Sequence, residues 1–397
     1  MSALFEPERR RRLILQRGRE RMISNRHPWI FSGAIHREHG SSDAAVADLY
    51  DSAGTLLASG FYSAHSQIRL RVMSFGEPFQ LPLLEERIVR AFASRKALLD
   101  RGTDALRLLN SEGDLVSGLI VDAYGDTLVV EIGSAGLDAL RGEVLRILQR
   151  EKRPRSIVFK NDLPTRKKER ISLEDVVVGE APGEVVITEN GIRFVVTPGA
   201  GQKTGFFLDQ RENRSLARTL SGDGEVLNLF SYSGAFGVYA AAGGATMVEE
   251  VDISGPAIEL ARRNHQMLGS PAQIEFRVTD VFDHLRKLEN DGRQFDLVVC
   301  DPPAFARSRG DVDRASRGYK DINLHALRLV RPGGHLMTFS CSGHIDATLF
   351  QKIIFGAALD APRNPSIVGR LTAGRDHPVS IDCPEGEYLK GLLLQVR

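Results

Sequence analysis

The chain has 397 residues, of which 42% are hydrophobic and 26% are charged, a composition typical of a globular protein with more than one domain. Its 52 Lys and Arg against 51 Asp and Glu give a formal net charge of +1, which excludes a uniformly basic nucleic-acid-binding protein. Three cysteines, an odd and sparse set, exclude a disulfide framework and a closed zinc site. Because no apolar run resembles a membrane span or a secretory signal, we expect a cytoplasmic protein with no membrane partner.

Two short stretches are strongly basic within this neutral chain. Residues 1–21 hold seven arginines against three glutamates, and residues 160–170 hold five basic against two acidic residues. Local basic patches of this kind suit a phosphate-bearing partner such as RNA. A solvated charged face is the alternative, and the charge pattern alone favours that alternative.

The predicted elements, taken in chain order, form three blocks. The first block, 1–80, contains short alternating stretches punctuated by glycines, which predicts a small, mostly β domain. The second, 81–185, combines two helices with several strands, which predicts a small α+β domain. The third, 186–397, alternates strand and helix for most of its length, and this alternation predicts an α/β domain with a doubly wound parallel sheet.

Five buried strands are predicted in the third block, over 225–230, 246–252, 274–280, 295–301 and 335–341. Ligands of open α/β sheets bind outside the carboxyl ends of the strands. The residues at these five ends are therefore the candidates for a functional site.

The first two strand ends carry a glycine loop and an acid. Residues 231–237 read Ser-Tyr-Ser-Gly-Ala-Phe-Gly, where glycine allows close backbone approach and the helix start offers N–H groups to an anion. Asp252 follows Gly234 by 18 residues, a spacing that suits an acid bound to ribose hydroxyls. Asp280 ends the third strand, and either acid could instead cap a helix. The loop and the acid fit a dinucleotide as well as an adenosine cofactor.

The fourth strand end carries Asp301-Pro302-Pro303-Ala304-Phe305. Two consecutive prolines force a stiff, extended loop, and a rigid loop with a carboxylate and an aromatic ring can hold a flat base. A dehydrogenase has no need for this element, so the loop favours an adenosine cofactor beside a base substrate. A purely structural double-proline turn is the alternative.

The fifth strand end carries Cys341, followed by Ser342 and Gly343. A buried cysteine in a strand is usually core filler, and we expect this for Cys300. The small, polar neighbours of Cys341 predict a position where the strand opens to the site, so its thiolate could act as a nucleophile. The residues alone leave both interpretations of Cys341 open.

Several motifs together resemble the RlmI family of bacterial cytosine-carbon-5 methyltransferases of large-subunit ribosomal RNA. The resemblance covers nearly the whole chain and includes HPWIFSGAI at 27–35, which is similar to the start of a PUA RNA-binding domain. The motifs that carry it are GQKTGFFLDQR (201–211), LNLFSYSGAFG (227–237), VDIS (251–254), DPPAF (301–305), RGYKDIN (317–323) and FSCSG (339–343).

This resemblance implies a class I, Rossmann-like methyltransferase domain preceded by a PUA-like domain and a central α+β domain. It implies S-adenosylmethionine as the cofactor, 23S ribosomal RNA as the partner, and a homodimer as one expected assembly. Carried over by position, it implies that Ser231, Tyr232 and Gly234 lie by the methionine part of the cofactor. Asp252 would hold the ribose, and Asp280 would lie near the adenine.

On the substrate side, the resemblance implies that Asp301 and Phe305 hold the target base and that Cys341 is the nucleophile. Lys203 and Arg211 belong to a segment that lines the cofactor or RNA side. Attack of the Cys341 thiolate on carbon 6 of cytosine would make carbon 5 nucleophilic toward a methyl group.

Ala304 stands where many RNA cytosine methyltransferases carry a second cysteine. A two-cysteine release mechanism is therefore excluded, in agreement with the single-cysteine RlmI pattern.

Three other functions compete with cytosine methylation. A guanine methyltransferase of ribosomal RNA has the same double-proline loop but needs no thiol. A non-catalytic RNA-binding factor of ribosome assembly would have no use for an intact glycine loop, Asp252 or Asp301. A small-molecule methyltransferase would leave the first block and its arginines without a role.

Overall fold

The computed structural model describes residues 3–99, 102–201, 203–306 and 308–397, so Gln202 of the GQKTGFFLDQR motif lies outside the described residues. The chain divides into two compact units, each built from separate segments of sequence. The domain boundaries expected at residues 80 and 185 stay predictions. The first unit comprises Met1–Ile187, Val196–Phe206 and Arg375–Gly386, and the second comprises Thr188–Val195, Phe207–Gly374 and Glu387–Arg397.

The first unit begins with a six-stranded sheet in the order β2-β6-β5-β4-β1-β3. Its strand pairs are antiparallel except for β1 and β4, which run parallel. Alternate residues such as Leu13 and Leu15 are buried, which is the periodicity of strands with one face in a core. The strands are β1 (Arg11–Leu15), β2 (Trp29–Phe31), β3 (Ile35–His39), β4 (Val46–Tyr50), β5 (Leu56–Tyr62) and β6 (Ile68–Phe75), and a short helix α1 (Arg21–Ser24) follows β1.

A five-stranded sheet in the order β11-β10-β9-β8-β7 follows in the same unit. The helix α5 connects β9 to the parallel strand β10, and the other pairs are antiparallel. The helix α2 buries Leu84 and Ile88, four residues apart, against this layer. The elements are α2 (Leu81–Ser94), α3 (Lys96–Leu99), β7 (Ala105–Asn110), β8 (Leu119–Tyr124), β9 (Thr127–Ile132), α4 (Ala135–Asp138), α5 (Arg141–Lys152), β10 (Ser156–Phe159), α6 (Pro164–Glu169) and β11 (Val176–Gly179).

Two residues of the basic stretches are structural rather than exposed. The Arg10 guanidinium is buried and pairs with Asp48 at 2.6 Å. Arg166 is also buried and pairs with Asp138 at 3.0 Å. Buried arginines of this kind cannot meet an RNA phosphate, so a count of charges overstates the basic surface.

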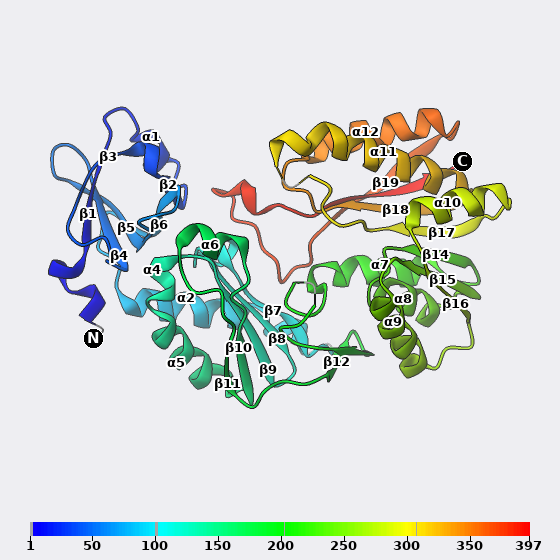
Figure 1. Ribbon diagram of the computed structural model, residues 1–397, viewed down its shortest axis with the longest axis horizontal. Helices are drawn as coiled ribbons and strands as arrows, with labels where there is room; N and C mark the ends of the chain where they lie inside the picture. The colour runs from blue at the N-terminus through cyan, green and yellow to red at the C-terminus, as the bar shows by residue number, and fades with distance from the viewer. Residues whose placement is uncertain (1–2, 100–101, 202, 307) are drawn as a thin grey trace. The chain divides into compact units, whose positions relative to one another are not determined.

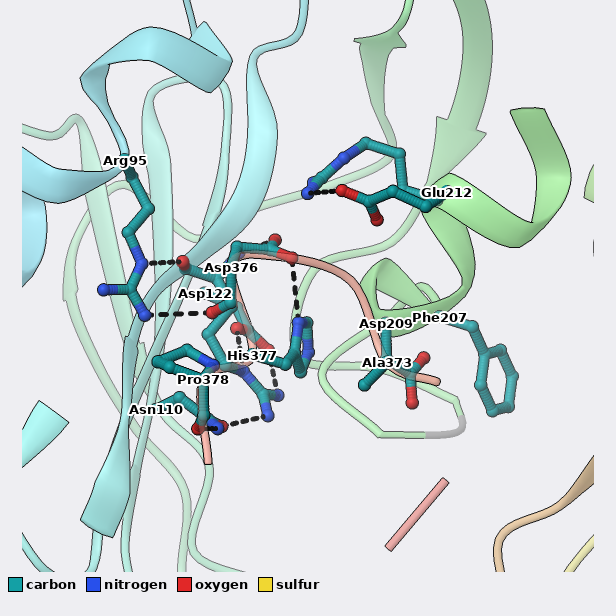
Figure 2. Close-up of polar contacts among 12 residues, drawn as sticks. Arg95, Asn110, Asp122, Phe207, Asp209, Glu212, Ala373, Asp376, His377 and Pro378 are labelled. Atoms are coloured by element: carbon teal, nitrogen blue, oxygen red, sulfur yellow. Dashed lines mark hydrogen bonds and ion pairs between the residues drawn. The ribbon is translucent and has the colours of Figure 1, made fainter. Parts of the chain in front are cut away.

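The segment Arg375–Gly386 returns to the first unit and is held there by polar contacts (Figure 2). Arg95 donates a hydrogen bond to the carbonyl oxygen of Asp376 at 3.0 Å, and Asn110 donates to that of Pro378 at 2.9 Å. The Asp376 side chain accepts from the backbone N–H of Arg107 at 2.9 Å. These buried contacts satisfy backbone groups that a loop would otherwise leave unpaired.

The second unit is built on a seven-stranded sheet in the order β16-β15-β14-β17-β18-β20-β19. The first five strands are parallel, and β20 and β19 are antiparallel to their neighbours. This arrangement confirms the predicted α/β sheet. The strands are β14 (Glu225–Leu229), β15 (Met247–Asp252), β16 (Gln273–Val278), β17 (Phe295–Cys300), β18 (Val330–Ser340), β19 (Pro365–Thr372) and β20 (Lys390–Val396).

Helices cover both faces of this sheet (Figure 1). One face packs against α7, α8 and α9 and the other against α10, α11 and α12. The chain enters the unit through the hairpin β12 (Val185–Glu189) and β13 (Ile192–Val196). The helices are α7 (Arg211–Leu220), α8 (Ala235–Ala242), α9 (Gly255–Leu268), α10 (Val281–Asn290), α11 (Val312–Leu329) and α12 (Ala347–Asp360).

The predicted strand ends differ from the structure by one or two residues. Asp301 and Cys341 lie directly after β17 and β18 rather than within them, and Asp280 lies beyond β16. The strand β18 begins at Val330 rather than at residue 335 and continues through Pro332. Each of these side chains is still at the carboxyl edge of the parallel sheet.

Candidate active site

The loop between β14 and α8 has an unusual backbone. Phe230, Tyr232 and Gly234 have φ values of 56°, 47° and 70°, so three of five consecutive residues are left-handed. Each such non-glycine residue costs about 1 kcal/mol or more, and strain of this kind concentrates at functional sites. The amide of Ser231 donates to the Val251 carbonyl at 3.0 Å, which ties the loop to the second strand.

Gly234 at the end of this loop and Gly237 in α8 pack closely against buried side chains, one of which is a carboxylate that the sequence analysis missed. A Cβ on Gly237 would lie 1.9 Å from Oε1 of Glu250, and a Cβ on Gly234 would lie 2.7 Å from that of Ala261. Glu250 is fully buried and bonds Asn228 and His265, each at 2.7 Å. An acid inside a buried strand was the available signal, because buried charges are almost always paired.

Asp252 links the loop to the end of β15. Its Oδ2 accepts from the backbone N–H of Tyr232 at 2.9 Å, and its Oδ1 accepts from that of Ser254 at 2.8 Å. The neighbouring Ile253 is 69% exposed, which presents an apolar surface beside the carboxylate.

Asp280 caps the helix α10. Its Oδ1 accepts from the backbone N–H groups of Phe282 at 2.8 Å and Asp283 at 3.2 Å. The helix-cap alternative that the sequence left open is therefore what the structure shows, and a role beside adenine stays a proposal.

These residues fit an adenosyl cofactor. The Oγ of Ser231 is buried and, among the described residues, has no hydrogen-bond partner, so a bound ligand would satisfy it. The glycine at 234 leaves backbone room for close approach, and Asp252 offers a fixed carboxylate for hydroxyl groups.

The loop after β17 holds its carboxylate and its aromatic ring in defined positions. Asp301 is half-buried and accepts a hydrogen bond from Nε2 of Gln210 at 2.9 Å. The Phe305 ring packs on Tyr319 with centroids 4.6 Å apart and an interplanar angle of 40°. Gln210 and Tyr319 were not singled out from the sequence, although both lie within motifs of the resemblance.

Cys341 lies beside this loop. Its Sγ is 3.9 Å from the carbonyl oxygen of Pro302, and the side chain is partly exposed. The next residue, Ser342, accepts from the backbone N–H of Ala306 at 3.1 Å and contacts the Tyr319 hydroxyl at 3.0 Å. Ser342 therefore joins the loop that carries the thiol to the loop that carries Asp301.

The other cysteine of this sheet is different. Cys300 is fully buried, and burial raises the pKa of its thiol. It is a core residue, as the sequence predicted.

The side chain of a buried lysine is hydrogen-bonded to the loop that begins with Cys341. Lys390 donates to the carbonyl oxygens of Ser342 and Ile345, both at 2.7 Å. Burial lowers the pKa of Lys390, and the charge of the nearby Cys341 thiolate acts in the opposite direction. A lysine within the apolar strand YLKGLLLQV was a signal that the sequence analysis did not use.

The remaining two predicted residues are Arg211 and Lys203. Arg211 begins α7, is only 3% exposed and pairs with Glu212 at 3.3 Å. Lys203 belongs to the first unit, where its neighbour Thr204 is bonded to Tyr124 at 2.7 Å. Their predicted contacts with cofactor or RNA stay predictions.

The sheet order, the strained glycine loop and the acids at neighbouring strand ends define a methyltransferase that uses S-adenosylmethionine. A family profile described as an S-adenosylmethionine-dependent methyltransferase matches residues 152–394, and a PUA-like domain profile matches residues 13–75. The chain belongs to the family of ribosomal RNA large subunit methyltransferase I.

Two relatives of that name carry this assignment. The protein of Pseudoalteromonas atlantica is 42% identical over 97% of this chain and 99% of its own length. That of Tolumonas auensis is 43% identical over 96% of this chain and 98% of its own length.

Solved structures show the same fold at lower identity. A methyltransferase complexed with S-adenosylhomocysteine has a TM-score of 0.84 at 23% identity, covering 97% of this chain and 100% of that one. An S-adenosylmethionine-dependent methyltransferase from Streptococcus mutans has a TM-score of 0.82 at 22% identity over the same shares of the two chains. Within the described parts of this chain, none of the helices has the length and apolar character needed to cross a membrane.

Proposed function

We propose that this enzyme methylates carbon 5 of a cytosine in 23S ribosomal RNA through a covalent adduct with Cys341. The names of the relatives support ribosomal RNA as the substrate, and the match to a PUA-like domain supports RNA binding. One observation carries the chemistry: Asp301 and Cys341 follow neighbouring parallel strands, in loops joined through Ser342.

Carbon 5 of cytosine is too poor a nucleophile to accept a methyl group directly. The Cys341 thiolate attacks carbon 6, which forms a sulfur–carbon bond and moves an electron pair to carbon 5. Asp301 holds the polar edge of the ring by accepting a hydrogen bond from its exocyclic amine. S-adenosylmethionine supplies the methyl group when bound. The carbon-5 proton then leaves to a base, and the thiolate departs as the double bond re-forms.

The other site residues position the reactants in this proposal. Ser231, Tyr232 and Gly234 hold the methionine part of the cofactor, Asp252 the ribose and Asp280 the adenine side. Phe305, Lys203 and Arg211 contact the RNA. Because carbon 6 is reached only from the face of the ring, the target base must leave its stack. A homodimer is also part of the proposal, and sedimentation of the purified chain tests it.

The decisive experiment is methylation of purified 23S ribosomal RNA with labelled cofactor, followed by nucleoside analysis. We expect 5-methylcytosine from the wild-type enzyme and none from Cys341→Ala. Cys383→Ala is the matched control, since this free cysteine lies in the first unit. RNA that contains 5-fluorocytidine should give a denaturation-resistant adduct with wild type and Cys383→Ala only.

A different product would contradict the cytosine assignment. Methylated guanine, formed equally by wild type and Cys341→Ala, would identify a nitrogen methyltransferase on the same fold. Absence of S-adenosylmethionine binding in calorimetry would instead support a non-catalytic RNA-binding factor.

A further inference from the structure

A chain of hydrogen-bonded amides ends at Asp301. Gln210 is 2% exposed, and its Nε2 donates to Oδ2 of Asp301 at 2.9 Å. The Oε1 of the same side chain accepts from Nδ2 of Asn213 at 2.6 Å. That nitrogen also donates to the backbone carbonyl oxygen of Thr372 at 3.0 Å.

The donor-to-acceptor direction of these hydrogen bonds follows from the bond between Asn213 and Thr372. A backbone carbonyl can only accept a hydrogen bond, so the nitrogen of the Asn213 amide must face Thr372. The same nitrogen then requires an oxygen from Gln210, which leaves the Gln210 NH₂ group to face Asp301. The orientation of both amides is therefore determined by the backbone rather than by the carboxylate.

An N–H donor directed at a carboxylate favours its ionised form. An ionised carboxylate can only accept hydrogen bonds. Cytosine presents its exocyclic amine as a donor at the position where uracil presents a carbonyl oxygen, which is an acceptor. A carboxylate held as an acceptor can therefore bond the amine of cytosine and repels the oxygen of uracil.

We propose that Gln210, oriented by Asn213, is a positioning residue that presents Asp301 with a donor and never with an acceptor, so that Asp301 is free to accept from cytosine and does not donate to uracil. This inference rests on the proposed function, because it takes Asp301 to face the target base. It also gives a role to the segment 203–211, whose individual residues the motif left unassigned.

Two acidic substitutions test the direction of the chain. In Gln210→Glu, one oxygen accepts from Asn213 and the other faces Asp301, so the two carboxylates must share a proton and the pair can donate. In Asn213→Asp, both N–H donors of Asn213 are lost, and the Gln210 amide turns its nitrogen toward the new carboxylate and its oxygen toward Asp301. Both variants should weaken the preference for cytosine, although Asn213 is hydrogen-bonded to Gln210 and Thr372 rather than to Asp301.

Gln210→Met is the matched control because it removes the hydrogen bond without adding an acceptor or a charge. This variant presents Asp301 with neither a donor nor an acceptor, so binding of both RNAs should weaken by a similar factor. A merely structural role for Gln210 predicts this same uniform loss in the acidic variants as well.

The readout is the ratio of dissociation constants for two RNAs, measured with S-adenosylhomocysteine present. The RNAs differ only in cytosine or uracil at the methylated position, which is first located by mapping the labelled methyl group to RNA fragments. We expect the ratio to fall at least tenfold in Gln210→Glu and Asn213→Asp and to stay within threefold of wild type in Gln210→Met. Thermal melting and cofactor affinity confirm that each variant is folded, and either acidic variant suffices if the other does not fold.

The two proposals fail in different ways. If wild type forms 5-methylcytosine and Asp301→Asn loses the preference, but both acidic variants keep it, the amide chain does not control Asp301 and this inference is overturned. If wild type forms no 5-methylcytosine, the proposed function fails first, whatever the ratios are.

Discussion

Lys390 donates a hydrogen bond of 2.7 Å to the carbonyl oxygen of Ser342, the residue that follows Cys341. A second bond of 2.7 Å reaches the carbonyl oxygen of Ile345, so one buried ammonium group closes the loop that carries the thiol. The same loop has no regular secondary structure between β18 and α12. A charged donor is the means by which its carbonyl groups are satisfied away from water.

Lys390→Met should loosen this loop and make the thiol less reactive. Two buried carbonyl groups would lose a charged donor, so we expect the free energy of unfolding to fall by about 3 kcal/mol. The loss of a nearby positive charge should also raise the pKa of the Cys341 thiol and slow its alkylation at neutral pH. Denaturant unfolding and the pH dependence of iodoacetamide labelling measure the two effects. Lys352→Met, at an exposed lysine of α12, is the control and should change neither. Equal labelling rates in both variants would contradict an electrostatic role for Lys390.

Gly237→Ala should abolish cofactor binding. The new methyl group would overlap Oε1 of Glu250, and neither Gly237 nor the fully buried carboxylate can move without displacing the loop 230–234. We expect the dissociation constant for S-adenosylmethionine in calorimetry to rise more than a hundredfold, or the fold to be lost. Gly255→Ala, at the first turn of α9, is the matched control because no atom lies within 4 Å of its added Cβ. If both variants bind the cofactor equally, the buried Glu250 carboxylate does not limit the space at residue 237.

The exposed arginines near β1 should contribute to RNA binding. Arg17, Arg19 and Arg21 are exposed, whereas Arg10 is buried. Replacing the three exposed residues by alanine should lower the slope of log K against log salt by about 2, because each phosphate contact contributes 0.7 to 0.9. Filter binding of 23S RNA fragments over a salt series measures this slope.

The control for that series replaces Arg146 and Arg150, two exposed arginines that both pair with Glu85. Their positive charge is already compensated locally, so the slope should match wild type. Identical slopes for wild type, the triple variant and the control would show that the arginines near β1 do not contact RNA phosphates. They would then belong to a solvated charged face, the alternative that the charge pattern favoured.

The parallel sheet could be predicted because its strands are buried on both faces. Runs such as the one that ends at Asp301 are almost entirely apolar, and their polar ends mark one edge of the sheet. The position of Asp301 and Cys341 after neighbouring strands followed from this edge and from the pairing of β17 with β18. The edge strand β19 was not predicted. Most of its residues are partly or fully exposed, so its sequence lacks the alternation of apolar and polar residues that indicates a strand.

The supporting residues could not be predicted in the same way. Gln210 and Asp301 are 91 positions apart, and neither periodicity nor spacing indicates that an amide reaches a particular carboxylate. Charge counts also do not identify partners, as the buried pair of Arg10 and Asp48 shows. Local patterns therefore indicate which residues reach the edge of the sheet, whereas packing determines which side chains hold them there.

Glu131 should make the stability of the first unit depend on pH. Its side chain is buried, and burial raises the pKa of this carboxyl to about 7 from an ordinary value of 4.5. Between these two values the folded state binds more protons than the unfolded state, so the free energy of unfolding falls as pH rises. We expect the wild-type protein to lose on the order of 3 kcal/mol between pH 4.5 and pH 7 through this residue, and little more above that range.

Glu131→Gln removes the titrating group and should be more stable than wild type at pH 8 but not at pH 4.5. The chain's one tryptophan, Trp29, lies in the same unit, so its fluorescence in urea reports the unfolding of this unit. Glu86→Gln, at an exposed glutamate of α2 that pairs with Arg90, is the control and should leave the pH dependence unchanged. If wild type and Glu131→Gln show the same difference in stability between the two pH values, Glu131 is ionised in the folded protein at neutral pH. In that case the nearby Arg107 and Lys160 would outweigh its burial.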